Sequence, residues 1–392
     1  MQTSKKNLYL FMILNLATIA SVPLLSSFLP MYFERIGYNQ FQIGLLTSLG
    51  PLCCIIVQPL SGVMADRAKF KNTVLQAIYI GCAVTTFALI FRQDYYYVFI
   101  VMLLQAVFQA GMVSLNETIT LEYLENTPWP YGIVRVFGSG GYALFSMVLG
   151  ALSGSYAKSI FIVTGLFGLV CILTMLKLPR IEGHQSKEQK VPYKKLFTIP
   201  NLMAYIFIHI IIQATLSFHL VFFPVYLKDL GGSDNFYGII LFFQTVGEWP
   251  FLIWGDKIIK KFGVTRIIMF SAIVSTLRLL LVYFLTDPLL ALPVNMLHGG
   301  TYIVITYTLA VYINKETPDE LKASGQAFNN LTAQGAGRMA GSFLGGILSQ
   351  YYGIKQTYLF ASILSILGIF AFTLMIQYNN RKKEAEKTAA PV

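Results

Sequence analysis

Six ionisable side chains lie inside long apolar segments of this 392-residue sequence. A charge at the centre of a lipid bilayer costs about 2.5–3.5 kcal/mol, so residues of this kind usually mark a path for a solute or an ion. Carboxylate, guanidinium and imidazole groups can hydrogen-bond a polar solute, and carboxylates and imidazoles can also exchange protons. We therefore expect a polar binding site inside a membrane protein. The six residues are Glu117, Arg135, Glu248, Arg278, His298 and Arg338.

The spacing of these residues divides most of them into two groups, one in each half of the chain. Glu117 and Arg135 lie on consecutive apolar segments, where a carboxylate and a guanidinium group can form a bidentate pair. Glu248, Arg278 and His298 form a similar group in the second half. For both groups, the alternative is a set of contacts that only fixes helix packing.

For the remaining ionisable residues within or near the apolar segments, the sequence gives weaker evidence of a role in the binding site. Two roles stay open for Arg338, which could contact a solute or pair with a carboxylate elsewhere. His209 and His219 lack charged neighbours in sequence, and we expect them to be structural. Glu122 and Glu125 lie near the end of their segment, which predicts a position at the membrane interface.

The segments that position these residues are too apolar for a soluble protein. Of the 392 residues, 55% are hydrophobic and 12% are charged, whereas soluble domains contain about 25% charged residues. Apolar runs of about 20 residues predict transmembrane helices, and no strand-like alternation indicates a β-barrel. We therefore expect an all-α integral membrane protein with twelve spans. The predicted spans are 7–33, 41–65, 73–91, 95–121, 132–156, 158–177, 201–227, 236–254, 265–285, 288–314, 321–351 and 355–378.

A polar segment divides the twelve spans into two pseudo-symmetric halves of six. The fifth and eleventh spans occupy equivalent places in the two halves, and both are rich in glycine. Glycine lets helices approach closely, and such helices can slide against neighbours during alternating access. The predicted parts are an N-terminal half over 1–177, a linker over 178–200, a C-terminal half over 201–378 and a tail over 379–392.

The distribution of Lys and Arg predicts the orientation of the helices. With both termini in the cytoplasm, 21 of the 29 Lys and Arg residues fall in cytoplasmic segments and five in external loops. This asymmetry is typical of a multi-pass protein in a bacterial-type inner membrane. It also explains the net charge of +11 without a nucleic-acid partner. The four cysteines lie in apolar runs, which indicates neither a disulfide nor a metal site.

Two of the predicted cytoplasmic helix ends carry a glycine followed closely by an aspartate. Gly62 is followed after three residues by Asp66 and Arg67, and the eighth span ends with Asp256 after a glycine. A carboxylate at such a position can accept hydrogen bonds from a neighbouring helix end. We expect Gly62, Asp66, Arg67 and Asp256 to act as a conformational latch.

These patterns resemble those of the major facilitator superfamily, whose transporters have two six-helix halves. Gly62-x3-Asp66-Arg67 is similar to the loop motif of that superfamily. Glu117 and Arg135 have the same 18-residue separation as a Glu and an Arg of the lactose permease group. The second-half motifs, Gly247-Glu248, Arg278 and Leu297-His298, also resemble that group and its phenylpropionate permease and nucleoside–proton symporter-like relatives.

The resemblance implies a role for each matching residue. Glu117, Arg135 and His298 would bind the substrate. Tyr142 would stack on it, in the place of a Trp in the family. Glu248 would couple substrate to proton movement. Three further assignments follow the same likeness: Arg278 and Glu117 would assist coupling, and Asn295, which stands in place of a family Lys, would contact substrate. The family carboxylate three residues after the His is Thr301 here, and its helix-eleven Lys aligns with Gln334.

We therefore predict a monomeric secondary transporter, most simply a proton-coupled symporter for uptake of a small polar solute such as a carbohydrate. The alternatives are a permease for a nucleoside or an aromatic carboxylate, and a facilitator or efflux antiporter. A membrane-embedded enzyme or sensor is disfavoured, because no nucleophile–base pair, metal cluster or phosphate loop stands out. The predicted partners are the solute, protons and membrane lipid. The driving force would be the proton gradient, with no cofactor and no metal.

Overall fold

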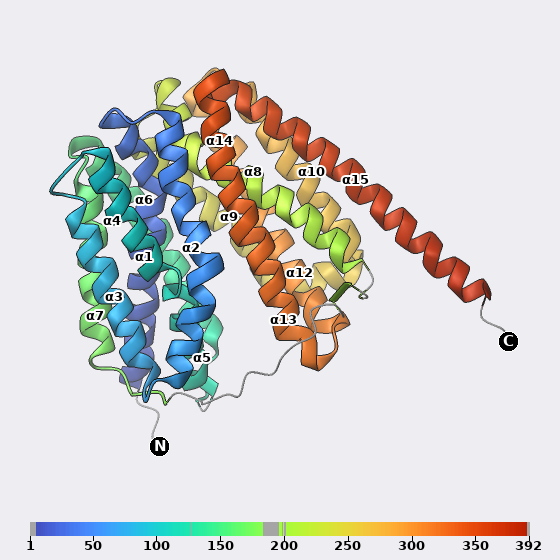
Figure 1. The fold of residues 1–392 in the computed structure, drawn as a ribbon, viewed down its shortest axis with the longest axis horizontal. Helices are drawn as coiled ribbons and strands as arrows, with labels where there is room; N and C mark the ends of the chain where they lie inside the picture. Colours follow the sequence, from blue (N-terminus) through green and yellow to red (C-terminus); the bar gives the residue numbers. More distant parts are fainter. Residues whose placement is uncertain (1–4, 126, 183–195, 198, 200, 390–392) are drawn as a thin grey trace.

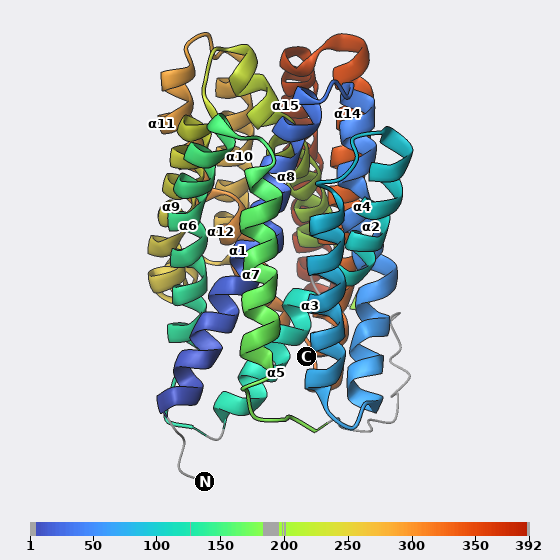
Figure 2. The ribbon, with the colours of Figure 1, turned by 90° about the vertical axis from the view of Figure 1, so that its left-hand side faces the viewer.

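The computed structural model describes residues 5–125, 127–182, 196–197, 199 and 201–389. Within these ranges the chain is a bundle of helices, with one isolated bridge between Phe70 and Glu182 as its only extended pairing. Figures 1 and 2 show the first half of the chain, in blue to green, beside the second half, in yellow-green to red. This arrangement confirms the all-α prediction.

In the described part of the N-terminal half, seven helices form six spans. The predicted fourth span is a single stretch from Tyr95 to Glu125 that is interrupted at Ala110 and Gly111. The helices are α1 (Lys5–Arg35), α2 (Gln40–Arg67), α3 (Lys71–Ala88), α4 (Tyr95–Gln109), α5 (Met112–Glu125), α6 (Tyr131–Ser155) and α7 (Ser159–Met175).

The C-terminal half repeats this plan with two interrupted spans. The tenth span contains η2 (Pro288–Leu290), α11 (Ala291–Met296), η3 (Leu297–Gly300) and α12 (Tyr302–Glu316). The eleventh contains α13 (Asp319–Asn329), the π-helical segment η4 (Asn330–Gly337) and α14 (Arg338–Tyr352). The uninterrupted helices are α8 (Leu202–Asp229), α9 (Asp234–Phe262), α10 (Val264–Tyr283) and α15 (Ile354–Ala389).

All twelve predicted spans coincide with helical stretches, although their lengths differ from the prediction. Among the described residues, nine stretches are long and apolar enough to cross a membrane. Another, α7, is an apolar helix of 17 residues. The last helix, α15, continues past the predicted end at residue 378 to Ala389. Most of the predicted linker, residues 183–195, 198 and 200, lies outside the described residues.

The two halves meet mainly along two helix pairs, α6 with α9 and α2 with α14 (Figure 2). We call the end of the bundle where α7 ends and α8 begins the linker end, and the opposite end the far end. At the far end, a Cβ on Gly44 would lie 2.8 Å from the Cα of Gly346. A Cβ on Gly150 would lie 3.0 Å from the Cα of Gly238. Only glycine permits such an approach of two backbones, which confirms the close packing predicted for the glycine-rich spans.

Candidate functional site

The N-terminal half contributes an ion pair and an aromatic side chain. Arg135, near the start of α6, donates from Nη1 to Glu117 Oε1 on α5. Both side chains are partly exposed, at 49% for Arg135 and 36% for Glu117. Two turns further along α6, the Tyr142 hydroxyl bonds the Ser27 hydroxyl of α1 at 2.8 Å. The pair predicted from sequence is therefore formed, and it keeps surface available for a ligand.

The C-terminal half contributes a linear chain of three ionisable groups centred on His298. Arg278 on α10 lies with Nη1 2.6 Å from His298 Nδ1, and His298 Nε2 lies 3.2 Å from Glu248 Oε1 on α9. A guanidinium group can only donate, so Nδ1 must accept and the proton of a neutral imidazole must sit on Nε2. Nε2–H then donates to the carboxylate. The histidine thus connects a buried cation to a carboxylate.

This chain depends on the interruption of the tenth span. His298 belongs to η3, the 3-10 segment between α11 and α12, and η3 contacts both α9 and α10. A tighter turn changes the direction in which side chains leave the helix. The segment carries His298 between the helices that hold Glu248 and Arg278. The motif Leu-His-Gly-Gly could be read from the sequence, but its 3-10 geometry could not.

The site residues of the N-terminal half lie near those of the C-terminal half. Arg135 lies near enough to Tyr302 of α12, and Tyr142 near enough to Glu248, for a charge on one group to affect the other. The Tyr302 ring stacks on His298, with 6.2 Å between ring centroids and 13° between planes. The structure therefore brings the predicted residues of both halves into one site.

Arg338, whose role the sequence left open, joins the same site. Its guanidinium carbon lies 5.3 Å from the centroid of the Tyr302 ring. Its Nε donates to Gln213 Oε1 of α8 at 2.9 Å. Neither Tyr302 nor Gln213 is among the site residues predicted from sequence, although Gln213 follows His209 by four residues in a mostly apolar helix. That spacing places both polar side chains on one helix face and was a usable signal.

Asn295 lies deeper than its predicted role requires. The side chain is fully buried, and its Oδ1 accepts from Gln244 Nε2 at 2.8 Å while its Nδ2 donates to the carbonyl of Ala291 at 2.8 Å. His219 Nε2 lies 3.0 Å from the same Oδ1. These bonds use the polar atoms of Asn295 inside the C-terminal half. The structure therefore separates Asn295 from the exposed part of the site.

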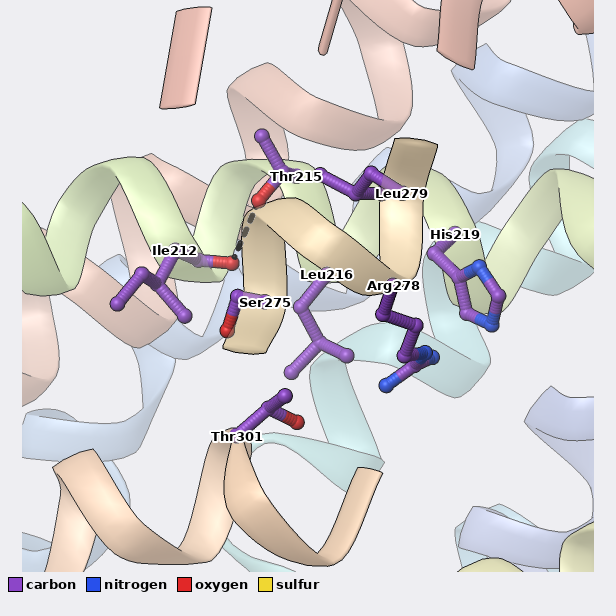
Figure 3. A pocket seen from close by; sticks show the side chains of 8 residues that line it. All are labelled: Ile212, Thr215, Leu216, His219, Ser275, Arg278, Leu279 and Thr301. Atoms are coloured by element: carbon purple, nitrogen blue, oxygen red, sulfur yellow. Dashed lines mark hydrogen bonds between the residues drawn. The ribbon is translucent and has the colours of Figure 1, made fainter. Parts of the chain in front are cut away.

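A small cavity lies behind the site, inside the C-terminal half (Figure 3). It has room for about one or two water molecules. Arg278 lines it, and the Nε and Nη2 atoms of this buried side chain have no hydrogen-bond partner among the described residues. The other lining residues are Ile212, Thr215, Leu216, His219, Ser275, Leu279 and Thr301. Within the described ranges, no group of three or more potential metal ligands occurs.

The predicted latch residues make contacts inside their own halves. Asp66 lies 3.3 Å from Lys71, which also pairs with Glu122. Asp256 accepts from the Tyr307 hydroxyl at 2.8 Å. The other two residues, Gly62 and Arg67, lie on α2 beside Asp66.

The far end carries ion pairs between the halves that the sequence analysis did not identify. Arg35 at the end of α1 lies 2.5 Å from Asp234 at the start of α9, and Ser153 Oγ donates to the same carboxylate at 2.9 Å. Lys228 of α8 lies 2.7 Å from Glu34 of α1. We call Glu34, Arg35, Lys228 and Asp234 the far-end gate. The sequence showed these charges only as loop residues, because pairing between distant segments leaves no local pattern.

Two helical halves with a charged site at their interface define a membrane transporter of the alternating-access type. The sequence profile of the MFS_1 like family matches residues 6–360. The chain therefore belongs to this family of major facilitator transporters and is a multi-pass membrane protein.

Relatives of the chain include transporters with different names. An uncharacterized transporter of Bacillus subtilis (strain 168), YwbF, is 29% identical over 96% of this chain and 94% of its own length. A maltose permease of Geobacillus stearothermophilus is 24% identical over 91% of this chain and 90% of its own length. The crystal structure of the nucleoside transporter NupG superposes with a TM-score of 0.83 and 20% identity, over 96% of this chain and all of that one. The structural likeness supports the fold.

Proposed function

We propose that this transporter is a proton-coupled symporter for uptake of a small polar solute such as a carbohydrate. The observation that carries the proposal is the chain from Arg278 through His298 to Glu248, which faces the Glu117–Arg135 pair of the other half. The first group offers a carboxylate that can take up a proton, and the second offers donors and acceptors for solute hydroxyl groups. The likeness to a maltose permease favours a carbohydrate.

The coupling step follows from the hydrogen bonds of Glu248. Ionised, this carboxylate accepts from His298 and balances the charge of Arg278 through the imidazole. Protonation removes that negative charge and gives the carboxyl group a hydrogen to donate, so it can bond a solute oxygen. Proton binding and solute binding then favour each other. Release of the proton on the other side of the membrane restores the bond to His298 and weakens solute binding.

The Lys and Arg distribution supports a cytoplasmic linker end, with both termini inside a bacterial-type inner membrane. The far-end gate and the glycine pairs would then close the outer face. The partly exposed Glu117–Arg135 pair would be reached from the cytoplasm in this conformation. Asn295 would position His219 and Gln244 behind the site rather than contact solute, since its polar atoms are already bonded.

Substrate-induced proton movement tests this proposal. Energy-depleted cells that express the protein are given candidate sugars, nucleosides and carboxylates in a lightly buffered medium. Symport predicts that the medium becomes alkaline when a substrate is added, and that a protonophore abolishes accumulation. Counterflow of solute without any proton movement would replace symport with facilitation. Acidification on solute addition to loaded cells would instead indicate antiport.

A nucleoside is the second candidate solute. It is favoured by the fold likeness to a nucleoside transporter and by the aromatic surface of Tyr302 and Tyr142. The same assay separates the candidates, because only a transported solute changes the external pH.

A further inference from the structure

Among the described residues, no carboxylate pairs with Arg338 of the site, either directly or through another side chain. Arg135 pairs with Glu117, and Arg278 is connected through His298 to Glu248. No described side chain places a carboxylate oxygen within salt-bridge distance of Arg338. Three arginines and two glutamates leave the site with one uncompensated positive charge. A charge inside a membrane protein is expensive, so its counter-charge is expected to exist when the site works.

The geometry of Arg338 leaves one side of its guanidinium group available. Nε donates to Gln213, and the face of the group lies over the Tyr302 ring. The two terminal nitrogens bond no described side chain, and the residue is only partly buried. Paired terminal N–H groups match the two oxygens of a carboxylate.

A row of buried polar side chains fixes this orientation. Gln213 accepts from Arg338 through Oε1, and its Nε2 lies 3.0 Å from His209 Nε2. His209 Nδ1 lies 2.8 Å from Asn329 Oδ1, and both Gln213 and His209 are fully buried. A carbonyl oxygen on Asn329 requires the proton of His209 on Nδ1, so Nε2 accepts from Gln213. Each hydrogen bond in the row therefore has only one possible donor and acceptor. This fixed pattern holds Arg338 in place before any ligand binds.

The position of Arg338 in its helix also points to a binding role. It directly follows η4, the π-helical segment Asn330–Gly337. Such segments are uncommon inside helices and occur frequently at functional sites. Arg338 also lies near Cys54 of α2 and near His298. It therefore lies where the two halves meet and beside the proton-accepting chain.

We infer that the transported solute is an anion and that Arg338 binds its carboxylate group. This inference rests on the proposed transport function and adds the charge class of the substrate to it. The Glu117–Arg135 pair then binds the remaining polar groups of the solute. A monoanion that moves together with one proton carries no net charge, so its transport does not respond to the membrane potential. A neutral solute moved with one proton would respond.

Matched pairs of solutes test the binding step in the purified, full-length protein. The probes are D-glucuronate with D-glucose, for a sugar acid, and benzoate with benzamide, for an aromatic acid. We expect the wild type to bind the carboxylate of one pair at least tenfold more tightly than its neutral partner. The pair that shows this preference indicates whether the carboxylate belongs to a sugar acid or to an aromatic acid. Absence of a carboxylate preference in both pairs would overturn the inference.

Variants of Arg338 separate binding from a structural role. Arg338→Gln should reduce the preference for the carboxylate to less than threefold while the affinity for the neutral partner changes little. Arg338→Lys should keep part of the preference, because the charge remains without the paired N–H groups. The control is Arg266→Gln, which removes one exposed positive charge of α10 outside the site. If Arg338→Gln keeps the preference of the wild type, the inference is wrong.

Transport in proteoliposomes distinguishes this inference from the proposed function. A pH gradient drives uptake of the preferred probe while potassium and valinomycin set the potential. Equal initial rates at zero and at 100 mV, inside negative, support an anion moved with one proton. Proton-driven uptake of only the neutral probes would overturn the anion assignment and leave symport intact. Carboxylate uptake that ignores the pH gradient would contradict symport and keep the role of Arg338.

Discussion

At the scale of single residues, the chemistry of the site depends on the two hydrogen bonds of a neutral histidine, His298. His298 accepts from one cation and donates to one carboxylate, so the charge states of Arg278 and Glu248 are linked although the two groups do not touch. Substitution of any member changes the hydrogen bonds of the others. The ion pair of the other half has only two members, and loss of either leaves one charge uncompensated.

Loss of the Glu117–Arg135 pair should abolish transport without preventing membrane insertion. Glu117→Gln keeps the size of the side chain but leaves Arg135 without its counter-charge. Arg135→Ala leaves the Glu117 carboxylate without its counter-charge. We expect uptake to fall by at least a factor of about 100, since a lost charge-assisted hydrogen bond costs about 1.5–3 kcal/mol and the solute contact is lost with it. Uptake by whole cells, with the amount of protein in the membrane measured in parallel, checks this. Uptake at the wild-type rate in either variant contradicts the assignment.

Glu248→Gln should separate solute movement from proton movement. An amide oxygen can still accept from His298, but the side chain can no longer take up a proton. Counterflow of solute should continue, whereas accumulation driven by a pH gradient should be lost. Glu316→Gln serves as the control, because it removes an exposed carboxylate at the end of α12. Retained gradient-driven accumulation in Glu248→Gln would assign the proton to another group.

The sequence allowed the charged residues of the site to be predicted, and the structure explains which others were missed. A charge inside an apolar run has a high energetic cost and is therefore conspicuous. Tyr302 and Gln213 are neutral and occur in apolar runs at little cost. Only the contact with His298 reveals Tyr302, whereas the spacing of Gln213 from His209 gave a weak signal in the sequence. Asn295 was assigned from a resemblance, and its burial could not be read from the sequence.

At the scale of helices, hydropathy predicted where the spans lie but not where they are interrupted. The 3-10 segment η3 and the π-helical segment η4 each lie inside a span that the sequence predicts as continuous. Their backbone hydrogen bonds differ from those of an α-helix because of packing against neighbouring helices. Hydropathy averaged along the sequence does not detect such packing. His298 lies in η3 and Arg338 directly follows η4, so the local geometry that the sequence did not predict is the geometry that positions these site residues.

Close helix contact at the far end should depend on Gly238. A Cβ there would lie 2.4 Å from the carbonyl oxygen of Ser146, so α6 and α9 must separate. Gly238→Ala should widen the far end, as measured by the distance between spin labels at positions 92 and 351 in a background without the native cysteines. The control is Gly140→Ala on α6, where an added Cβ meets no atom within 4 Å. An unchanged distance distribution in Gly238→Ala would contradict the role of this contact.

At the scale of the whole molecule, two ion pairs of unequal strength join the halves at the far end. Asp234 is 5% exposed and bonds both Arg35 and Ser153, whereas the Glu34 and Lys228 side chains are 23% and 35% exposed. Water screens the second pair more than the first, so exposed pairs contribute only about 0.2–1 kcal/mol. A charge-assisted bond to a buried carboxylate contributes about 1.5–3 kcal/mol. Closure of the far end should therefore depend mainly on Asp234.

Substitutions of the far-end gate should shift the population of the state that is closed at that end. Asp234→Asn should lower the ratio of closed to open molecules by a factor of about 10 or more, and Lys228→Gln by less than about fivefold, because 1.4 kcal/mol corresponds to a tenfold change. The spin-label distance at the far end reports both populations. Arg35→Gln combined with Asp234→Asn should shift the ratio by much less than the product of the two single effects, because both remove the same ion pair. Strictly multiplicative effects would mean that Arg35 and Asp234 act independently, which would contradict a role of their ion pair in closing the far end.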